Sequence, residues 1–334
     1  MSVQEMHQTE KTKNNSDRRL PDFIIIGAMK AGTSTLHHIL ASHPDVFMPD
    51  NEIFFYDMDD FIQHSDFFFE TDKKWYFPEL DKHLARYMDQ YASLFEKAKK
   101  SQILGEDSTT YLASRRAPER INRINPKAKL IVMLRDPASR TYSQYWHLLK
   151  TGRAIYDFEN TLRINPKSVI ERSLYQNQIE HFFKFIPKEL FCFVIFEEFI
   201  HHIKEVMQEI CKFLDITYGR IDFERLNIHQ NPAMLPRYLK FQIWCNRMML
   251  TRYKQVNAHR LADASITQQI LHNRPTIYKR VLNGLHQRIN PMKQSMPPAM
   301  KESTKKMLNE YFSRENNGLS ELINKNLDDF WYQT

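Results

Sequence analysis

The chain has 334 residues, of which 42% are hydrophobic and 26% are charged, and its formal net charge is +7. A chain of this length can bury a full core, which allows one large or two modest domains. Its three cysteines, Cys192, Cys211 and Cys245, show no CxxC spacing, which argues against a disulfide framework or a zinc site and suits a reducing compartment.

Residues 1–20 are polar and charged, so we predict a disordered tail without a signal peptide. The apolar run from Phe23 to Ala28 is too short to span a bilayer. Over residues 21–334 we predict a single domain, with a basic helical insertion at about 220–295.

The first predicted unit is a strand, a turn and a helix over residues 23–40. A β-branched run reaches Gly27, and a helical spacing follows through Leu36, Ile39 and Leu40. The backbone N–H groups at the start of such a helix lack partners, and the helix dipole is positive there. The turn is therefore predicted to bind an anion such as phosphate.

The spacing of this turn differs from that of an ordinary phosphate-binding loop. Gly27 and Gly32 stand as in G-x-x-x-x-G-K-[ST], but Thr33 occupies the position of the lysine. The lysine of this turn is Lys30. Its ammonium group would lie partway round the turn, near a single phosphate and its leaving-group oxygen.

Acidic and aromatic side chains mark the next part of the chain. Glu52 stands in the run Asn51-Glu52-Ile53-Phe54-Phe55. Residues 57–79 are dense in aromatic side chains, which either line a sugar- or lipid-binding cleft or pin a loop to the core. Residues 80–100 have the spacing of an amphipathic helix.

A second anion-binding element is predicted where a buried strand over residues 129–134 ends in Arg135-Asp136-Pro137. Ser143 lies two turns into the helix that follows. The arginine and the serine can both reach one phosphate, the arginine through a charge-assisted fork. Two phosphate sites on successive strand–helix units fit a nucleotide phosphorylated at its 5′ and 3′ positions, where ATP or GTP would need only one.

The later elements continue the alternation of strand and helix. Helices are predicted over residues 171–186 and 203–214, with a buried strand over 190–196 between them. The alternation predicts a three-layer α/β fold, in which helices flank a mainly parallel central sheet and ligands bind at the carboxyl ends of the strands. The turn at residues 27–32 makes the nucleotide-binding core P-loop-like.

Positive charge is concentrated between residues 236 and 293. This segment has one acid, Asp263, and eleven basic residues, at positions 237, 240, 247, 252, 254, 260, 274, 279, 280, 288 and 293. The charge either steers an anionic donor or acceptor, contacts an acidic membrane, binds nucleic acid, or forms a solvated helical face. No RRM, helix-turn-helix or zinc-finger pattern supports nucleic acid.

Together these motifs resemble those of the sulfotransferases that use 3′-phosphoadenosine 5′-phosphosulfate (PAPS). Residues 30–34 match the family's K-x-G-T-[ST/R] loop for the 5′-phosphosulfate, and residues 129–145 resemble its 3′-phosphate element. The resemblance runs from about Asp22 to Trp331, and only residues 220–295 lack a clear counterpart. It implies a nucleotide site made by Lys30, Ala31, Gly32, Thr33, Ser34, Thr35, Arg135, Ser143, Tyr175 and Lys293.

The resemblance also implies a catalytic pair, Glu52 and Lys30. In the glycan-modifying branch the matching segment is K-E-x-x-F-F, and its glutamate is the catalytic base. Asn51 replaces the lysine of that motif, which leaves open what binds the acceptor or the sulfate in its place. Residues 103–112 resemble the family's G-E-[KA]-[ST]-P-x-Y-[LF] strand and turn. Within this chain Asp107, His37 and His38 are the rival bases.

The implied reaction is sulfuryl transfer from PAPS to an alcohol or amine, which leaves adenosine 3′,5′-bisphosphate and needs no metal. Glycan, lipid, polyketide and small phenol acceptors all stay open, and the Glu52 motif favours a glycan. Golgi members of the family carry an N-terminal membrane anchor, and residues 1–20 show no such apolar segment. We therefore expect a soluble cytoplasmic protein, or else a Golgi-luminal fragment lacking its anchor. The oligomeric state is not predicted.

Two other functional classes stay as alternatives. A P-loop phosphotransferase would have a lysine after Gly32 and an acidic Mg²⁺ ligand at a strand end, where Thr33 and Arg135 stand instead. A catalytically silent protein that keeps the nucleotide fold is the other alternative.

Overall fold

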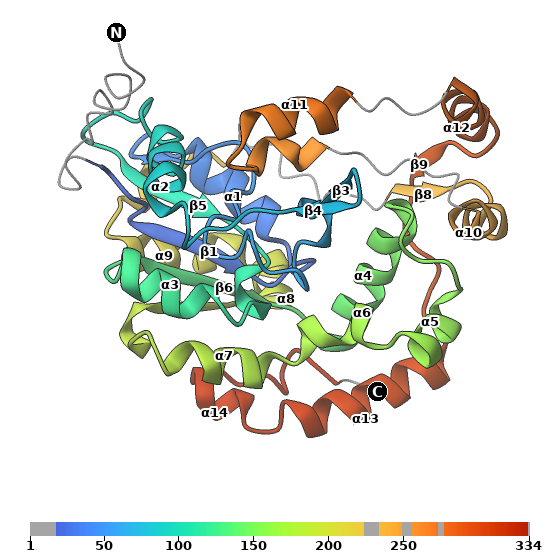
Figure 1. The fold of residues 1–334 in the computed structure, drawn as a ribbon. Helices are drawn as coiled ribbons and strands as arrows, with labels where there is room; N and C mark the ends of the chain where they lie inside the picture. The colour runs from blue at the N-terminus through green and yellow to red at the C-terminus, as the bar shows by residue number, and fades with distance from the viewer. Residues whose placement is uncertain (1–17, 224–233, 249–255, 273–276, 333–334) are drawn as a thin grey trace, which may run out of the picture.

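The computed structural model describes residues 18–223, 234–248, 256–272 and 277–332 (Figure 1). Most of the predicted tail, residues 1–17, therefore lies outside the described residues. Within the described ranges, no helix combines the length and the apolar character needed to cross a bilayer.

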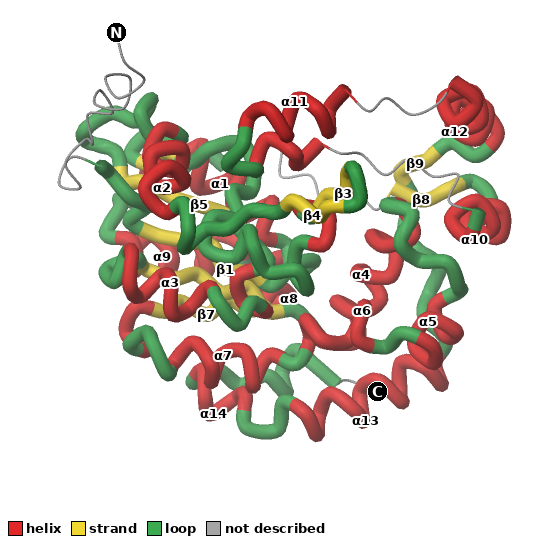
Figure 2. The backbone as a smooth tube through the Cα atoms, in the orientation of Figure 1, coloured by secondary structure: helices red, strands yellow, loops and turns green. Residues whose placement is uncertain are grey.

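Five parallel strands form the central sheet, as the alternating pattern predicts (Figure 2). Their order is β2-β5-β1-β6-β7. The strands are β1 (Phe23–Gly27), β2 (Val46–Phe47), β5 (Ile103–Asp107), β6 (Lys129–Leu134) and β7 (Phe191–Ile195). All five residues of the central strand β1 are buried, because helices flank the sheet and leave no face to water.

The helices around the sheet carry the main core. They are α1 (Thr33–Ser42), α2 (Leu84–Ser93), α3 (Ala117–Ile124), α7 (Tyr175–Phe183), α8 (Phe196–His201) and α9 (Ile203–Leu214). Near the C-terminus, the buried Trp331 donates from Nε1 to Glu197, 3.0 Å away, and its ring centroid lies 5.9 Å from that of Tyr175. The chain end thus packs against the residues that follow β7.

A second helical cluster extends from the end of β6. It is built on α4 (Pro137–Lys150), which packs with α5 (Phe158–Ile164), α6 (Lys167–Ile170) and α13 (Glu302–Glu315), while α14 (Leu319–Ile323) packs against α7 (Figure 1). Its buried side chains include Tyr145, Leu149, Phe158, Leu308 and Phe312. This cluster fixes the direction of α4, which carries Ser143.

The helix predicted over residues 171–186 is interrupted at Leu174. A 3₁₀ turn over Glu171–Ser173 precedes α7. The Ser173 hydroxyl accepts from Arg140 and donates to the carbonyl of Pro137, 3.0 Å away. This buried contact with α4 holds the chain away from a continuous helix. Other 3₁₀ turns in the described ranges include Ser65–Phe67, Tyr111–Ala113, Lys188–Leu190 and Tyr218–Arg220.

The described parts of the basic segment attach at two different places. β8 (Met234–Pro236) pairs antiparallel with β9 (Met292–Gln294), beside α10 (Leu239–Arg247) and α12 (Ile277–Ile289). The 3₁₀ turn η8 (Val256–Arg260) and α11 (Ala264–His272) pack instead on the antiparallel hairpin of β3 (Phe69–Thr71) and β4 (Lys74–Tyr76). Figure 1 shows α11 over this hairpin, away from α10 and α12.

Candidate active site

The turn after β1 and the first two residues of α1, together residues 28–34, are called the anion loop below. Gly32 has φ 89° and Lys30 has φ 72°, so the loop curls through two left-handed residues before the helix begins. A Cβ on residue 32 would lie 2.6 Å from the Phe196 ring, which explains why glycine stands there. No backbone N–H of Gly32, Thr33 or Ser34 donates to another described residue, so these groups remain available to an anion.

Arg135 leaves the end of β6 and closes one side of the anion loop. Its Nη1 donates to the carbonyl of Lys30, 3.3 Å away, and its guanidinium carbon lies 4.7 Å from the centroid of the Phe196 ring. Its Nε is buried and meets no partner in the described part of the chain. Burial lowers the pKa of Arg135, and the nearby Glu197 opposes that shift. The guanidinium thus keeps an unused donor beside the loop.

One face of α4 also lies near the anion loop. Ser143, His147 and Lys150 follow at helical spacing and share one face of that helix. Burial, then Lys150 and Arg135, lower the pKa of Lys30. Burial, then Lys30 and Arg153, lower the pKa of His147 to about 4. The half-buried Ser143 therefore lies on the same face of α4 as Lys150, which lowers the pKa of Lys30, and His147, whose pKa Lys30 lowers.

Glu52 faces the anion loop from the segment that follows β2. Its carboxylate accepts from the backbone N–H of Thr109, 3.0 Å away, and from the Thr109 hydroxyl. Burial and then the neighbouring Asp107 raise the pKa of Glu52. Glu52 in turn raises the pKa of Lys30, so the carboxylate and the ammonium lie within electrostatic reach of each other. The two groups predicted to form the catalytic pair are thus brought together.

The rival bases have other partners or lie at the surface. Asp107, at the end of β5, is buried, and its Oδ2 lies 3.5 Å from Nδ1 of His37. His38 is exposed on α1. Burial raises the pKa of Asp107, and His37 lowers it. Glu52 is thus half-buried and its charge acts on Lys30, whereas Asp107 is buried and has His37 of α1 as a partner.

The remaining two residues of the predicted nucleotide site lie further from the loop. Tyr175 is fully buried, and its hydroxyl donates to the backbone carbonyl of Arg135, 2.9 Å away. It thus lies behind Arg135 and supports the strand end. Lys293 is exposed on β9, where it pairs with Leu235. No contact joins Lys293 to the anion loop in the described ranges.

Hydroxyl groups of residues 108–111 hold the backbone of residues 52–57, called the Glu52 segment. The Ser108 hydroxyl accepts from the N–H groups of Ile53 (3.2 Å) and Phe54 (2.8 Å), and the Tyr111 hydroxyl accepts from Tyr56 (3.1 Å). Both hydroxyls donate to the fully buried carboxylate of Glu106. Burial raises the pKa of Glu106 to about 7.

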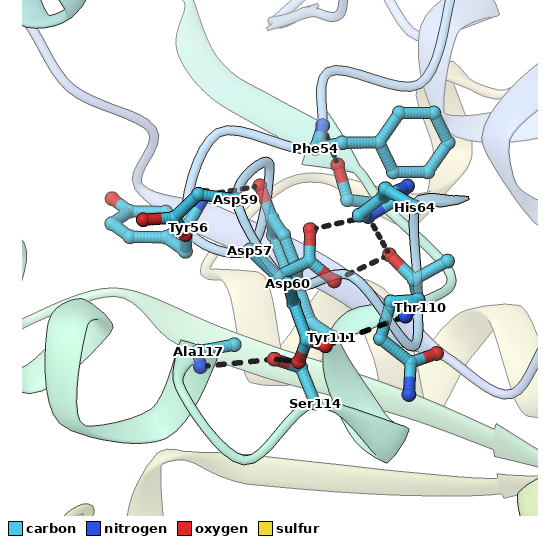
Figure 3. Close-up of polar contacts among 12 residues, drawn as sticks. Phe54, Tyr56, Asp57, Asp59, Asp60, His64, Thr110, Tyr111, Ser114 and Ala117 are labelled. Carbon is cyan, nitrogen blue, oxygen red and sulfur yellow. Dashed lines mark hydrogen bonds and ion pairs between the residues drawn. The ribbon is translucent and has the colours of Figure 1, made fainter. Parts of the chain in front are cut away.

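A buried polar triad ends the Glu52 segment (Figure 3). His64 Nε2 lies 2.8 Å from Asp57 Oδ1, and the Thr110 hydroxyl donates to Asp57 Oδ2 at 2.7 Å. Figure 3 shows the Phe54 ring beside His64, and their ring centroids are 4.8 Å apart. The triad ties the segment to the turn after β5, so β5 and its turn position Glu52 from several sides.

Two arginines at the site were missed from the sequence. Arg172 donates to the sulfur of Met29 in the anion loop and to the side-chain oxygen of Gln63, 2.7 Å away. Arg260 donates to the carbonyl of Ile53. The sequence signal for Arg172 was its position three residues before Tyr175. Nothing in the sequence distinguished Arg260 from the other basic residues around it.

Comparisons with known proteins agree with this geometry. A family model described as "Sulfotransferase family" matches residues 21–220. The chain is similar to heparan sulfate glucosamine 3-O-sulfotransferase 5 of Mus musculus, with 28% identity over 70% of this chain and 63% of that protein. It is also similar to heparan sulfate glucosamine 3-O-sulfotransferase 3B1 of Homo sapiens, with 30% identity over 56% of this chain and 44% of that protein. The chain thus spans less than two thirds of the length of these relatives.

A solved structure shows the same fold. The crystal structure of a sulfotransferase from Alicyclobacillus acidocaldarius superposes with a TM-score of 0.59 at 20% identity, and the match covers 93% of this chain and 99% of that one. The family predicted from the motifs is confirmed, since the family model covers more than half of the chain. This chain belongs to the sulfotransferase family.

Proposed function

We propose that the chain transfers a sulfuryl group from PAPS to a hydroxyl or amine of an acceptor. One observation carries the proposal. The anion loop with Lys30, the guanidinium of Arg135 and the carboxylate of Glu52 converge at the carboxyl edge of β1, β5 and β6, where parallel sheets bind ligands.

The residues at this edge fit a donor with two anionic groups. The free N–H groups of Gly32, Thr33 and Ser34 suit the 5′-phosphosulfate, together with Ala31 and Thr35. The unpartnered Nε of Arg135 suits a 3′-phosphate, with Ser143 on the adjacent helix. Tyr175 would act by supporting Arg135, and Lys293 would cover the nucleotide.

The chemistry follows from the positions of Glu52 and Lys30. Bound PAPS would supply the sulfuryl group and a phosphate leaving group. Glu52 takes the proton of the acceptor hydroxyl as the new S–O bond forms, and its raised pKa makes it a stronger base. Lys30 and the loop N–H groups neutralise the charge that collects on the departing oxygen as the old S–O bond breaks. Adenosine 3′,5′-bisphosphate leaves.

For the acceptor we infer an anionic glycan. The similar proteins named above are heparan sulfate sulfotransferases. Beside the site, burial and then Lys30, Arg153, Lys150 and Arg172 lower the pKa of His147, so several cations lie near its ring. Arg153 is 43% exposed, and its nearest acidic partner, Asp66, lies 3.8 Å away. Exposed cations near the anion loop suit an acceptor that carries carboxylates or sulfates.

An acceptor screen with radiolabelled PAPS tests the proposal. The full chain is incubated with heparan sulfate, a neutral glycan of similar length, 4-nitrophenol and a lipid extract, with EDTA present. Label transferred to heparan sulfate and not to the neutral glycan is expected. Transfer to 4-nitrophenol or lipid alone would replace the glycan by that acceptor, and transfer to none of them would favour the silent binding protein.

Calorimetry separates the phosphotransferase alternative. Adenosine 3′,5′-bisphosphate should bind without Mg²⁺, whereas ATP should bind more weakly because it has no 3′-phosphate for Arg135. Binding of ATP with Mg²⁺ but not of the bisphosphate would reject the sulfotransferase reaction.

A further inference from the structure

The unit formed by η8 and α11, residues 256–272, reaches the candidate site from outside the matched family region, which ends at residue 220. We propose that Arg260 of this unit is a positioning residue for Glu52. The inference rests on the proposed function, because Glu52 is the base only in that reaction.

Arg260 contacts the backbone that carries Glu52. Its Nη1 donates to the carbonyl of Ile53, and its Nη2 lies 3.5 Å from the carbonyl of Glu52. Its guanidinium carbon lies 4.6 Å from the centroid of Phe67 and 5.3 Å from that of Phe54. The planar guanidinium of arginine can pack against these rings and donate to two adjacent carbonyls at once. The compact ammonium of lysine lacks that shape.

Arg260 is itself held by fixed elements. Its own carbonyl accepts from the Tyr87 hydroxyl of α2, 3.0 Å away. Asn257 donates to Asp66 at 2.9 Å, and Ala258, Leu261 and Ile270 pack with Phe69 of the β3–β4 hairpin in a small buried cluster. The guanidinium therefore extends from a backbone that is held in place, and its hydrogen bonds restrict the motion of the Glu52 segment.

The opposite edge of the Glu52 segment is held by the β5 turn. Ser108 and Tyr111 accept its N–H groups, while Arg260 donates to its carbonyl groups. Loss of Arg260 would release the carbonyl edge and leave the Ile53 oxygen without this donor in a buried place. The carboxylate would then sample positions away from the acceptor oxygen, and a misplacement of this kind lowers turnover more than binding.

The charge of Arg260 has to be separated from its shape. The charged and titratable groups that face Glu52 are Lys30 of the anion loop, Asp107 of β5, His64, Arg172 and Arg260. Arg260→Lys keeps the positive charge and loses the fork. Arg260→Met removes both, so the carboxylate loses a favourable charge and its pKa should rise further.

The chain offers a matched control in Arg247 of α10. Its Nε donates to the carbonyl of Ile155 at 2.7 Å, and its guanidinium carbon lies 5.0 Å from the Tyr156 ring centroid. Arg247→Lys therefore also removes an arginine contact to a backbone carbonyl and a ring, at an exposed position of the basic segment, without touching the Glu52 segment.

Hydrogen exchange and kinetics together test the proposal on the full chain. In Arg260→Lys, amide exchange of a peptide covering residues 52–57 should speed up roughly tenfold, while peptides from β1 and β6 keep their protection. With heparan sulfate as acceptor, kcat should fall roughly tenfold and the KM for PAPS should change by less than about twofold. Arg260→Met should also move the acidic limb of the kcat/KM profile, where the Glu52 base loses its proton, to higher pH.

The outcomes decide in either direction. Exchange over residues 52–57 that stays as slow as in Arg247→Lys would overturn the proposal, and so would faster exchange with an unchanged kcat. If the unaltered chain transfers sulfate to none of the acceptors, the proposed function fails by that result alone. The exchange comparison would then still decide whether Arg260 orders this segment.

Discussion

Arg135 donates from Nη1 to the backbone carbonyl of Lys30 over 3.3 Å, which joins two motifs that lie 105 residues apart in the chain. The end of β6 and the anion loop therefore form one unit around the ring of Phe196. In this unit we assign Lys30 to the 5′-phosphosulfate of the donor and Arg135 to its 3′-phosphate.

Arg135→Ala should weaken binding of adenosine 3′,5′-bisphosphate by about 2–4 kcal/mol, because it removes a charge-assisted partner of the 3′-phosphate. Adenosine 5′-phosphosulfate, which lacks that phosphate, should lose much less, namely what the contact between Arg135 and the Lys30 carbonyl contributes. Calorimetry with both ligands measures the difference. Arg237→Ala, at an exposed arginine, is the control. Equal losses for both ligands would reject the 3′-phosphate assignment.

Gly32→Ala should lower the free energy of unfolding by about 1–3 kcal/mol, since residue 32 has a left-handed backbone and an added Cβ would meet the Phe196 ring. Bisphosphate affinity should fall with it, because the loop N–H groups shift. Urea unfolding and calorimetry check both effects. The control is Gly219→Ala, where nothing lies within 4 Å of the added Cβ. If both substitutions cost the same, the Phe196 contact does not constrain the loop.

Glu106 should make stability depend on pH. Burial raises its folded pKa to about 7 from an ordinary value of 4.5, so the folded chain holds this proton more tightly than the unfolded chain. Its contribution is present in full below the unfolded value and is lost as the pH rises to the folded value, by about 3 kcal/mol in total. The difference in unfolding free energy between the unaltered chain and Glu106→Gln should therefore fall between about pH 4.5 and 7. A difference that stays flat with pH would show that the carboxyl titrates normally.

Sequence reasoning predicted the parts of the site that depend on local chain geometry. The anion loop follows from Gly32 at the start of a helix, and the place of Arg135 follows from the end of a buried strand. Glu52 was predicted as the base because it keeps its register in a short motif. Each of these features needs only a few neighbouring residues, so a pattern can show it.

The parts that were missed depend on contacts between distant segments. Arg260 meets Ile53 across 207 residues, and no local pattern predicts that contact. The break at Leu174 depends on Ser173 meeting Arg140 and Pro137 of α4. Tyr175 stays a prediction for the nucleotide site, and the packing of α7 adds a contact that the sequence did not predict, from its hydroxyl to the Arg135 carbonyl.

The assignment of Glu52 as general base is the central claim, and Glu52→Gln tests it most directly. The amide keeps the shape and an oxygen for the Thr109 N–H but cannot take a proton. Bisphosphate affinity should stay within about twofold, while turnover with heparan sulfate falls by ~10² or more. Turnover that stays normal in Glu52→Gln would contradict the account and would move the base to Asp107 or to a histidine.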